Sequence, residues 1–283
     1  MTSRRLPRRK RFSGQSFNRM LPNMMTLLGL CIGLSAIRLG LNDRFGAAVI
    51  ALAVSAVIDG LDGRLARLLK ATSRFGAEFD SLADFLCFGI APALLLYMWS
   101  LQNWGAVGFL PPLMYASSMA LRLARFNAAL DSAPKAAFAY NFFTGVPAPA
   151  GAGLALFPLF LGLEANQLHL TWLYDLVSYP IVTGAVLVAV AGLSVSTLPV
   201  WSFKNFKVPA GGVLPLLIGV VVLAAVIFAD PYAAGALLDI VYIAMLPLSL
   251  RSYHKLAREA EARRAAATPP ETQDAEAPKP ANA

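Results

Sequence analysis

The stretch 59–84 reads DGLDGRLARLLKATSRFGAEFDSLAD and lies between two long apolar runs. It contains four aspartates in two pairs: Asp59 and Asp62, then Asp80 and Asp84. If both runs are helices, residues three or four apart share a face, so each pair presents its carboxylates on one side. A short turn near residues 70–74 would make the helices antiparallel neighbours. The sequence therefore predicts that four carboxylates converge.

Charged groups in such an apolar chain need compensation, since each costs about 2.5–3.5 kcal/mol at the centre of a bilayer. Two bare carboxylates about 4 Å apart also repel by about 4 kcal/mol at an effective dielectric near 20. Hard cations remove this repulsion, and all-oxygen ligands suit magnesium, manganese or calcium. A pair of such ions is the usual apparatus of phosphoryl transfer. The alternative is a structural role, in which the aspartates pair with Arg64, Arg67 and Arg74.

The same stretch resembles the signature of the CDP-alcohol phosphotransferase family, D-x-x-D-G-x-x-A-R, eight residues, then G-x-x-x-D-x-x-x-D. Every fixed position is filled: Asp59, Asp62, Gly63, Ala66, Arg67, Gly76, Asp80 and Asp84. The resemblance implies two divalent ions per site, Mg²⁺ or Mn²⁺ with Ca²⁺ possible, held by the four aspartates. It also implies that Asp84 is the catalytic base, accepting the proton of the attacking hydroxyl.

The resemblance further implies a site for CDP-diacylglycerol beside the aspartates. Its expected residues are Gly63, Ala66 and Arg67 in the signature, Ser73 in the following turn, and Asn23 and Thr26 at the start of the first apolar run. Gly63 would let the nucleotide approach the backbone closely. For Asn23 the alternative is a helix-capping role, and for Ser73 it is a solvated turn hydroxyl.

Composition indicates an integral membrane protein. Of 283 residues, 57% are hydrophobic and 14% charged, and the mean hydropathy is +0.60. Eight apolar segments predict about eight transmembrane helices in an all-α fold, because most are long enough to cross a bilayer. They lie at 24–41, 45–69, 75–99, 105–126, 146–163, 176–198, 211–229 and 232–250. The expected organisation is a basic cytoplasmic arm over 1–22, a transmembrane catalytic domain over 23–250, and a mostly disordered cytoplasmic tail over 251–283. For the arm, a disordered segment and a membrane-surface helix are the two alternatives.

The distribution of Lys and Arg predicts the orientation. The arm, the 64–74 turn, the 122–135 loop, the 204–207 loop and the tail are basic, so these parts and both termini should be cytoplasmic. Asp59 lies ~21 Å along a helix that enters from the outer side, and Asp84 ~14 Å along one that enters from the inner side. The carboxylates should therefore lie in the inner half of the cell membrane, in a polar cavity that opens to the cytoplasm. With a net charge of +8, we expect the basic residues to face anionic lipid headgroups and not nucleic acid.

Four further stretches resemble the bacterial and archaeal phosphatidylserine synthases within this family. They are DSLAD with FGIAPA (80–93), RLARFN (122–127), FTGVPAP (143–149), and LSVST followed by SFK (193–204). Residues 198–201 depart from the expected pattern, which leaves the role of the 198–207 loop open. The resemblance implies transfer of a phosphatidyl group from CDP-diacylglycerol to L-serine by a homodimer. Arg122, Arg125 and Lys204 are candidates for binding the serine carboxylate, with contacts to lipid headgroups as the alternative.

Other functions remain open from the sequence alone. The signature does not distinguish serine from glycerol phosphate, inositol phosphate or choline as the acceptor. A cation transporter could also place four aspartates in a helical bundle. A transporter site usually lies at the membrane midplane, whereas these aspartates are expected towards the inner end.

Overall fold

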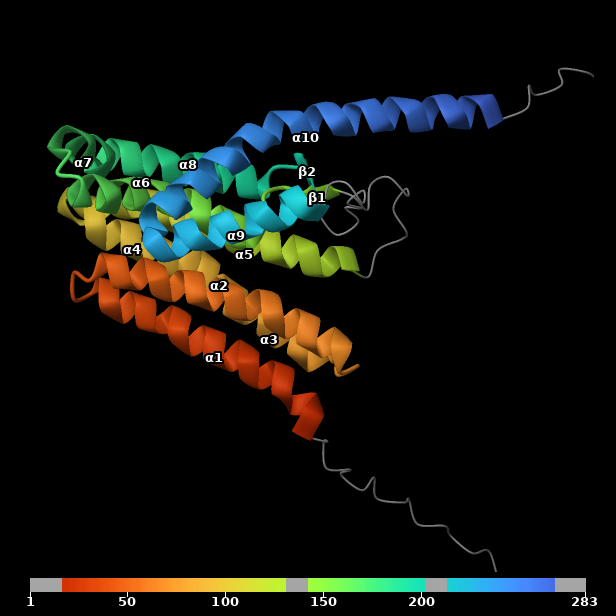
Figure 1. Cartoon of the computed structure of the whole chain (residues 1–283), viewed down its shortest axis with the longest axis horizontal. Coiled ribbons are helices and arrows are strands. Elements are labelled where there is room, and N and C mark those ends of the chain that lie inside the picture. Colours follow the sequence, from red (N-terminus) through yellow and green to blue (C-terminus); the bar gives the residue numbers. More distant parts are fainter. Residues whose placement is uncertain (1–16, 131–141, 202–212, 268–283) are drawn as a thin grey trace, which may run out of the picture.

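The computed structural model describes residues 17–130, 142–201 and 213–267, which form a bundle of helices (Figure 1). The first half contains α1 (Phe17–Gly40), α2 (Phe45–Leu68), α3 (Arg74–Asp84), the π-helical turn η1 (Phe85–Ile90), α4 (Ala91–Leu96), η2 (Tyr97–Leu101), η3 (Gln102–Trp104) and α5 (Gly105–Leu130). The second half contains α6 (Ala148–Gln167), α7 (Thr171–Ser178), α8 (Pro180–Val195), α9 (Val213–Ala229) and α10 (Pro231–Ala267). The prediction of a mostly helical protein is confirmed.

Every predicted apolar segment is helical, with some differences at its ends. Within the described residues, five helical runs are long and apolar enough to cross a membrane, or six if α7 and α8, bent by 55°, form one span. The run Arg74–Ala129 is 56 residues long and turns back at Gly105, where φ is +55°. It is therefore a hairpin of two legs, α3–η2 and α5, which pack against each other.

Two helix boundaries differ from those that the apolar segments predicted. The first segment was expected from residue 24, but α1 begins at Phe17 and contains Pro22. The last helix was expected to end near residue 250, but α10 continues to Ala267. In Figure 1, the start of α1 and the end of α10 lie at the same end of the bundle.

Two short strands interrupt the otherwise helical fold. The strands β1 (Phe142–Thr144) and β2 (Pro199–Trp201) pair antiparallel. Gly145 follows β1 with φ +76°, and a Cβ there would lie 2.8 Å from the carbonyl oxygen of Ser196. Only glycine fits this backbone conformation at such a close approach. The ribbon joins the entrance of α6 to the exit of α8, a link that helical periodicity does not predict.

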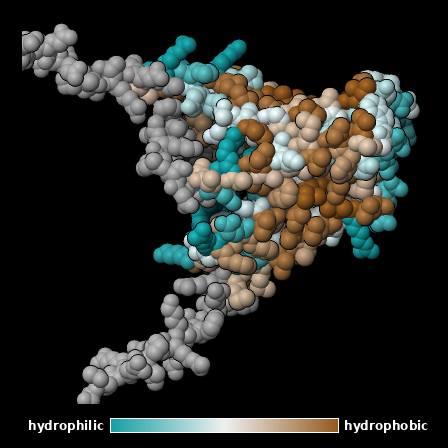
Figure 2. Space-filling model, turned by 180° about the vertical axis from the view of Figure 1, so that it is seen from behind, coloured by the Kyte–Doolittle hydropathy of each residue, from teal (hydrophilic) through white to brown (hydrophobic). Residues whose placement is uncertain are grey.

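The outer surface of the bundle is hydrophobic. Figure 2 shows a broad hydrophobic band with hydrophilic residues at its two ends. Most side chains of α9 are apolar and exposed, such as those of Val221 and Phe228. Exposed apolar area on this scale indicates a lipid-facing surface.

Small residues let the helices around α1 approach closely. A Cβ on Gly33 would lie 2.4 Å from Sγ of Cys87, and one on Gly29 would lie 3.2 Å from Ile58. The hydroxyl of Ser55 donates a hydrogen bond to the carbonyl of Gly29 at 2.9 Å. Such contacts are typical of helix packing in membranes, where small residues bring backbones together. They fix α2 and η1 against α1.

The π-helical turn η1 begins directly after Asp84 and is supported by a buried tyrosine. The hydroxyl of Tyr115, fully buried in α5, donates to the carbonyl of Phe88 at 2.7 Å. A π-helical turn departs from the α-helical pattern of backbone hydrogen bonds, and such turns are frequent at functional sites. Tyr115 therefore stabilises the backbone that follows Asp84.

We predict that Tyr115→Phe destabilises the protein because it leaves the Phe88 carbonyl buried without this partner. Such a loss costs about 1–3 kcal/mol, which for a protein of this size lowers the thermal midpoint by about 2–10 °C. The midpoint can be measured in detergent by differential scanning fluorimetry. Tyr97→Phe keeps the ring contact of Tyr97 with Phe109 and is the control. Equal midpoints for the two variants would contradict the role of the Tyr115 hydroxyl.

Candidate active site

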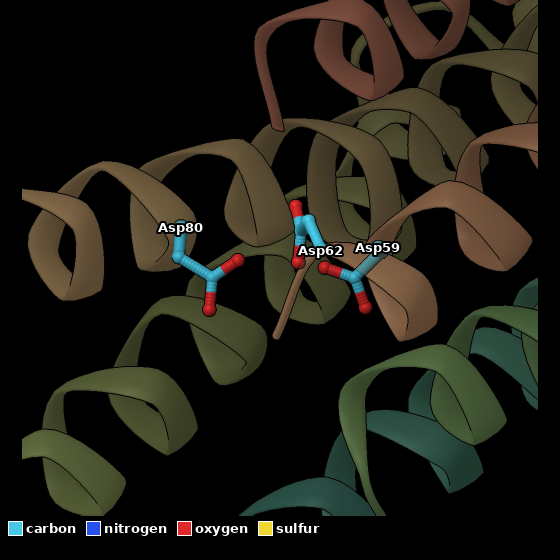
Figure 3. A group of neighbouring side chains, drawn as sticks. All are labelled: Asp59, Asp62 and Asp80. Atoms are coloured by element: carbon cyan, nitrogen blue, oxygen red, sulfur yellow. The ribbon is translucent and has the colours of Figure 1, made fainter. Parts of the chain in front are cut away.

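Three of the predicted aspartates meet at the hairpin of α2 and α3. Asp59 and Asp62 lie in α2 and Asp80 lies in α3, and their carboxylates point towards a common space (Figure 3). One oxygen from each lies within 4.8 Å of the others. Asp62 is 2% exposed, and the other two are half-buried. The predicted convergence of the two helical faces is therefore present for these three residues.

The fourth aspartate lies beside this group. Asp84 is the last residue of α3, and its carboxyl is within hydrogen-bonding reach of Asp59. Its Oδ1 is buried and has no hydrogen-bond partner. The four carboxyl groups thus form a continuous acidic cluster, with one buried oxygen of Asp84 left free for a ligand.

The cluster is not neutralised by arginine or lysine in the described part of the chain. No ion pair within 4.0 Å joins any of the four aspartates to a described basic residue. Arg64, Arg67 and Arg74 are all exposed. The alternative of purely structural Asp–Arg pairing has no support in this geometry.

Neighbouring polar groups orient the cluster and the start of α3. The hydroxyl of Thr26 in α1 donates to Oδ2 of Asp62 at 2.6 Å. Ser73 caps α3, its hydroxyl accepting the backbone N–H of Gly76 at 3.0 Å. A Cβ at Gly76 would lie 2.9 Å from Oδ1 of Asn23, so glycine permits the close approach of α3 to α1. Thr26 therefore orients Asp62 directly, and Ser73 caps α3 in addition to lining the cavity described next.

An open cavity of about 240 Å³ lies between α1, α2 and α3. Asp62 and Asp80 line it together with every residue expected to bind CDP-diacylglycerol: Asn23, Thr26, Gly63, Ala66, Arg67 and Ser73. A Cβ built on Gly63 would meet nothing within 4 Å, so the backbone there is open to a ligand. The structure brings these residues together around one space, and their roles remain proposals.

The basic residues expected to bind serine have different positions. Arg122 is buried, and its Nε donates to the carbonyl of Val146. Arg125 donates to the carbonyls of Val195 and Ser196, at 2.7 and 3.1 Å. Arg125 therefore holds the end of α8 near the β-ribbon, a structural contact that the sequence did not predict. Lys204 lies outside the described residues.

The arrangement fits divalent cations. The donors are carboxylate oxygens, which are the ligands that Mg²⁺, Mn²⁺ and Ca²⁺ prefer. No described basic residue forms an ion pair with these carboxylates, although the charge of Arg122 acts on Asp84. The hydrogen bond from Thr26 is the kind of contact that orients a metal ligand. Asp59, Asp62 and Asp80 would hold one ion, and Asp84 could share a second.

Two polar residues of α10 that the sequence did not predict, Asp239 and Tyr242, lie near this region. Both have a buried oxygen without a hydrogen-bond partner. An acidic residue inside an apolar run was the available signal for Asp239, because such residues in membrane helices usually have a function. Nothing in the sequence pattern distinguishes Tyr242.

Comparisons with known proteins identify the family. Residues 19–191 match the sequence model of the CDP-alcohol phosphatidyltransferase family. A CDP-diacylglycerol–serine O-phosphatidyltransferase of Mycobacterium tuberculosis is 39% identical over 242 residues, covering 86% of this chain and 82% of that protein. One from Helicobacter pylori is 32% identical over 215 residues, covering 76% and 84%. The matched region contains α2, α3 and all four aspartates, so this chain belongs to the CDP-alcohol phosphatidyltransferase family.

Proposed function

We propose that the protein transfers the phosphatidyl group of CDP-diacylglycerol to L-serine, giving phosphatidylserine and CMP. The observation that carries the proposal is the cluster of Asp59, Asp62 and Asp80, with which no described basic residue forms an ion pair. Asp62 and Asp80 of this cluster line the cavity together with the signature residues Gly63, Ala66, Arg67 and Gly76. The acceptor is inferred from similar proteins, which are named as serine transferases over most of the chain.

The cavity between α1, α2 and α3 would bind the cytidine diphosphate part of the donor. Arg67 lines it with an exposed, permanently charged guanidinium, whose planar fork suits phosphate oxygens. Gly63 offers unobstructed backbone. The hydroxyl of Ser73 remains available as a second contact, because its cap bond uses only one acceptor site.

The aspartates would hold divalent ions against the pyrophosphate. Asp59, Asp62 and Asp80 would hold one ion, and Asp84 would complete the site of another. When bound, Mg²⁺ or Mn²⁺ supplies Lewis-acid stabilisation of charge on the phosphoryl oxygens and on the leaving group. Thr26 keeps Asp62 in its orientation through the 2.6 Å hydrogen bond.

Asp84 would act as the general base. The serine hydroxyl oxygen forms a bond to the phosphorus that carries diacylglycerol, and the bond from that phosphorus to the CMP oxygen breaks. The hydroxyl proton passes to Asp84, whose Oδ1 is free of protein partners. CMP departs with the electron pair of the broken bond. A positioned base of this kind contributes about 10²–10⁴-fold to the rate.

Arg122 is the best-placed candidate for the serine carboxylate. Its Nε is fixed on Val146, which leaves both terminal NH₂ groups without a hydrogen-bond partner in the described structure. Its charge also acts on Asp84, which supports its choice as the group that would bind an acceptor next to that residue. We further propose that the cavity opens to the cytoplasm, where serine and CMP are soluble, and that the protein is a homodimer.

Purified protein supplied with CDP-diacylglycerol, radiolabelled L-serine and Mn²⁺ or Mg²⁺ tests the proposed function. We expect labelled phosphatidylserine and equimolar CMP, both lost with a chelator. Glycerol 3-phosphate, inositol phosphate and choline, each labelled, serve as competing acceptors. Transfer to one of these in preference to serine would overturn the choice of acceptor, and no transfer to any would overturn the proposed chemistry.

Asp84→Asn should lower kcat by about 10²–10⁴-fold, because the amide cannot accept the serine proton. CDP binding, measured by calorimetry with Mn²⁺ present, should change by no more than a few-fold. Glu78→Gln removes an exposed acid on the same helix and is the matched control, with activity equal to wild type. Normal turnover by Asp84→Asn would exclude Asp84 as the base.

Thr26→Val should weaken Mn²⁺ binding about 10–100-fold, the usual effect of removing a group that orients a metal ligand. Valine has nearly the same shape as threonine but cannot donate to Asp62. Electron paramagnetic resonance of free Mn²⁺ measures the affinity. Ser35→Ala, which removes an exposed hydroxyl of α1 bonded to Cys31, is the control. Equal affinity in Thr26→Val and wild type would show that Asp62 is not a ligand or needs no such support.

A further inference from the structure

A second, larger cavity lies between α2, α6 and α10, bordered by η1 and α9. Its volume is about 410 Å³, within the range of about 300–1,000 Å³ for small-molecule sites. The lining is apolar, with residues such as Leu52, Phe88, Leu156 and Phe160, apart from Asp239 and Tyr242. A cavity of this size and polarity suits hydrocarbon.

Asp239 and Tyr242 are unusual in such surroundings. Asp239 is 7% exposed, and its Oδ2 has no hydrogen-bond partner; the hydroxyl of Tyr242 is also buried and unpaired. Three residues apart on α10, they lie on the same face of the helix. A Cβ on Gly153 of α6 would lie 2.9 Å from Oδ1 of Asp239, so glycine makes room for the carboxyl. Leaving such buried groups without a partner is unfavourable, which points to a polar group of a ligand as their partner.

This cavity adjoins the catalytic aspartates. Cys87 and Phe88 line it, and they also line a small pocket that contains Asp59 and Asp84. Arg122 lies within electrostatic range of both Asp84 and Tyr242. The polar end of the cavity is therefore next to the place where the phosphoryl group of the donor would react.

We propose that this cavity binds one acyl chain of CDP-diacylglycerol together with its ester group, which Asp239 and Tyr242 recognise by hydrogen bonds. The proposal rests on the proposed function. Diacylglycerol is hydrocarbon except at its two esters, which lie a few bonds from the phosphate and are acceptors only. Tyr242 can donate its O–H to an ester carbonyl, and Asp239 can do so as a neutral carboxylic acid. An isolated carboxylate in an apolar cavity is very costly, which favours that neutral form.

Serine is a poor occupant for the same cavity. Its ammonium and carboxylate would both lose hydration among apolar side chains, and only one acidic and one phenolic group are present to replace it. A hydrocarbon chain alone would fill the space but leave Asp239 and Tyr242 unpaired. The ester-bearing chain satisfies both requirements.

The test compares CDP-diacylglycerol with CDP-dialkylglycerol, an ether-linked analogue of equal chain length that lacks the ester carbonyls. Binding of each lipid to the purified full-length protein is measured in detergent by competition against a fluorescent CDP-lipid, and kcat/KM is measured in the transfer assay. Wild type should prefer the ester lipid by roughly tenfold, because the ether lipid leaves buried groups unpaired. Tyr242→Phe and Asp239→Leu should weaken binding of the ester lipid. The ratio of ester-lipid affinity to ether-lipid affinity should then be close to one.

Tyr232→Phe, on the same helix but not lining the cavity, is the matched control and should keep the wild-type ratio. An unchanged ratio in both cavity variants, or a wild-type ratio near one, would overturn the proposal even if serine transfer is intact. If transfer to serine fails altogether, the proposed function is wrong. The ratio of ester-lipid to ether-lipid affinity still decides whether the cavity recognises an ester group. Asp239→Asn, which keeps an N–H donor, should retain part of the preference and separates hydrogen bonding from a packing defect.

Discussion

Mutual repulsion between carboxylates is the constraint on which the rest of this structure depends. Oxygens of Asp59, Asp62 and Asp80 lie within 4.8 Å of one another, and no described basic residue pairs with them. At an effective dielectric near 20, each such pair of charges repels by about 3–4 kcal/mol. A fold that holds these carboxylates together without a paired basic side chain is suited to bind divalent cations. The ions would then be shared by the protein and the pyrophosphate of the substrate.

The helical frame around the cluster is built to resist that repulsion. Glycines bring α1 against its neighbours, as Gly33 does at Cys87 and Gly76 does at Asn23. The helix sets the spacing of the acids along α2 and along α3, and the packing of both helices against α1 fixes the spacing between them. Thr26 adds a direct hydrogen bond to the most buried acid. The site therefore lies on rigid elements, which metal ligands require for their geometry.

The sequence predicted the site better than its surroundings, for a physical reason. Spacings of three and four residues determine which face of a helix an acid occupies, so the convergence of α2 and α3 followed from the local pattern and one short turn. The local pattern does not predict the partners of Arg125. Its hydrogen bonds to Val195 and Ser196 depend on a fold that brings α5 to the end of α8. The β-ribbon and the cavity beside Asp239 were missed for the same reason: periodicity does not specify which helices pack together across the bundle. The start of α1 was missed because Pro22 is tolerated within it.

Anomalous X-ray diffraction from crystals grown with Mn²⁺ and CDP tests the central claim most directly. The account predicts anomalous density between α2 and α3, with Asp59, Asp62 and Asp80 as ligands of one ion and Asp84 beside a second, and the diphosphate in contact with the metal. Absence of any anomalous peak at these carboxylates, with each of them paired to an arginine or lysine instead, would contradict the account.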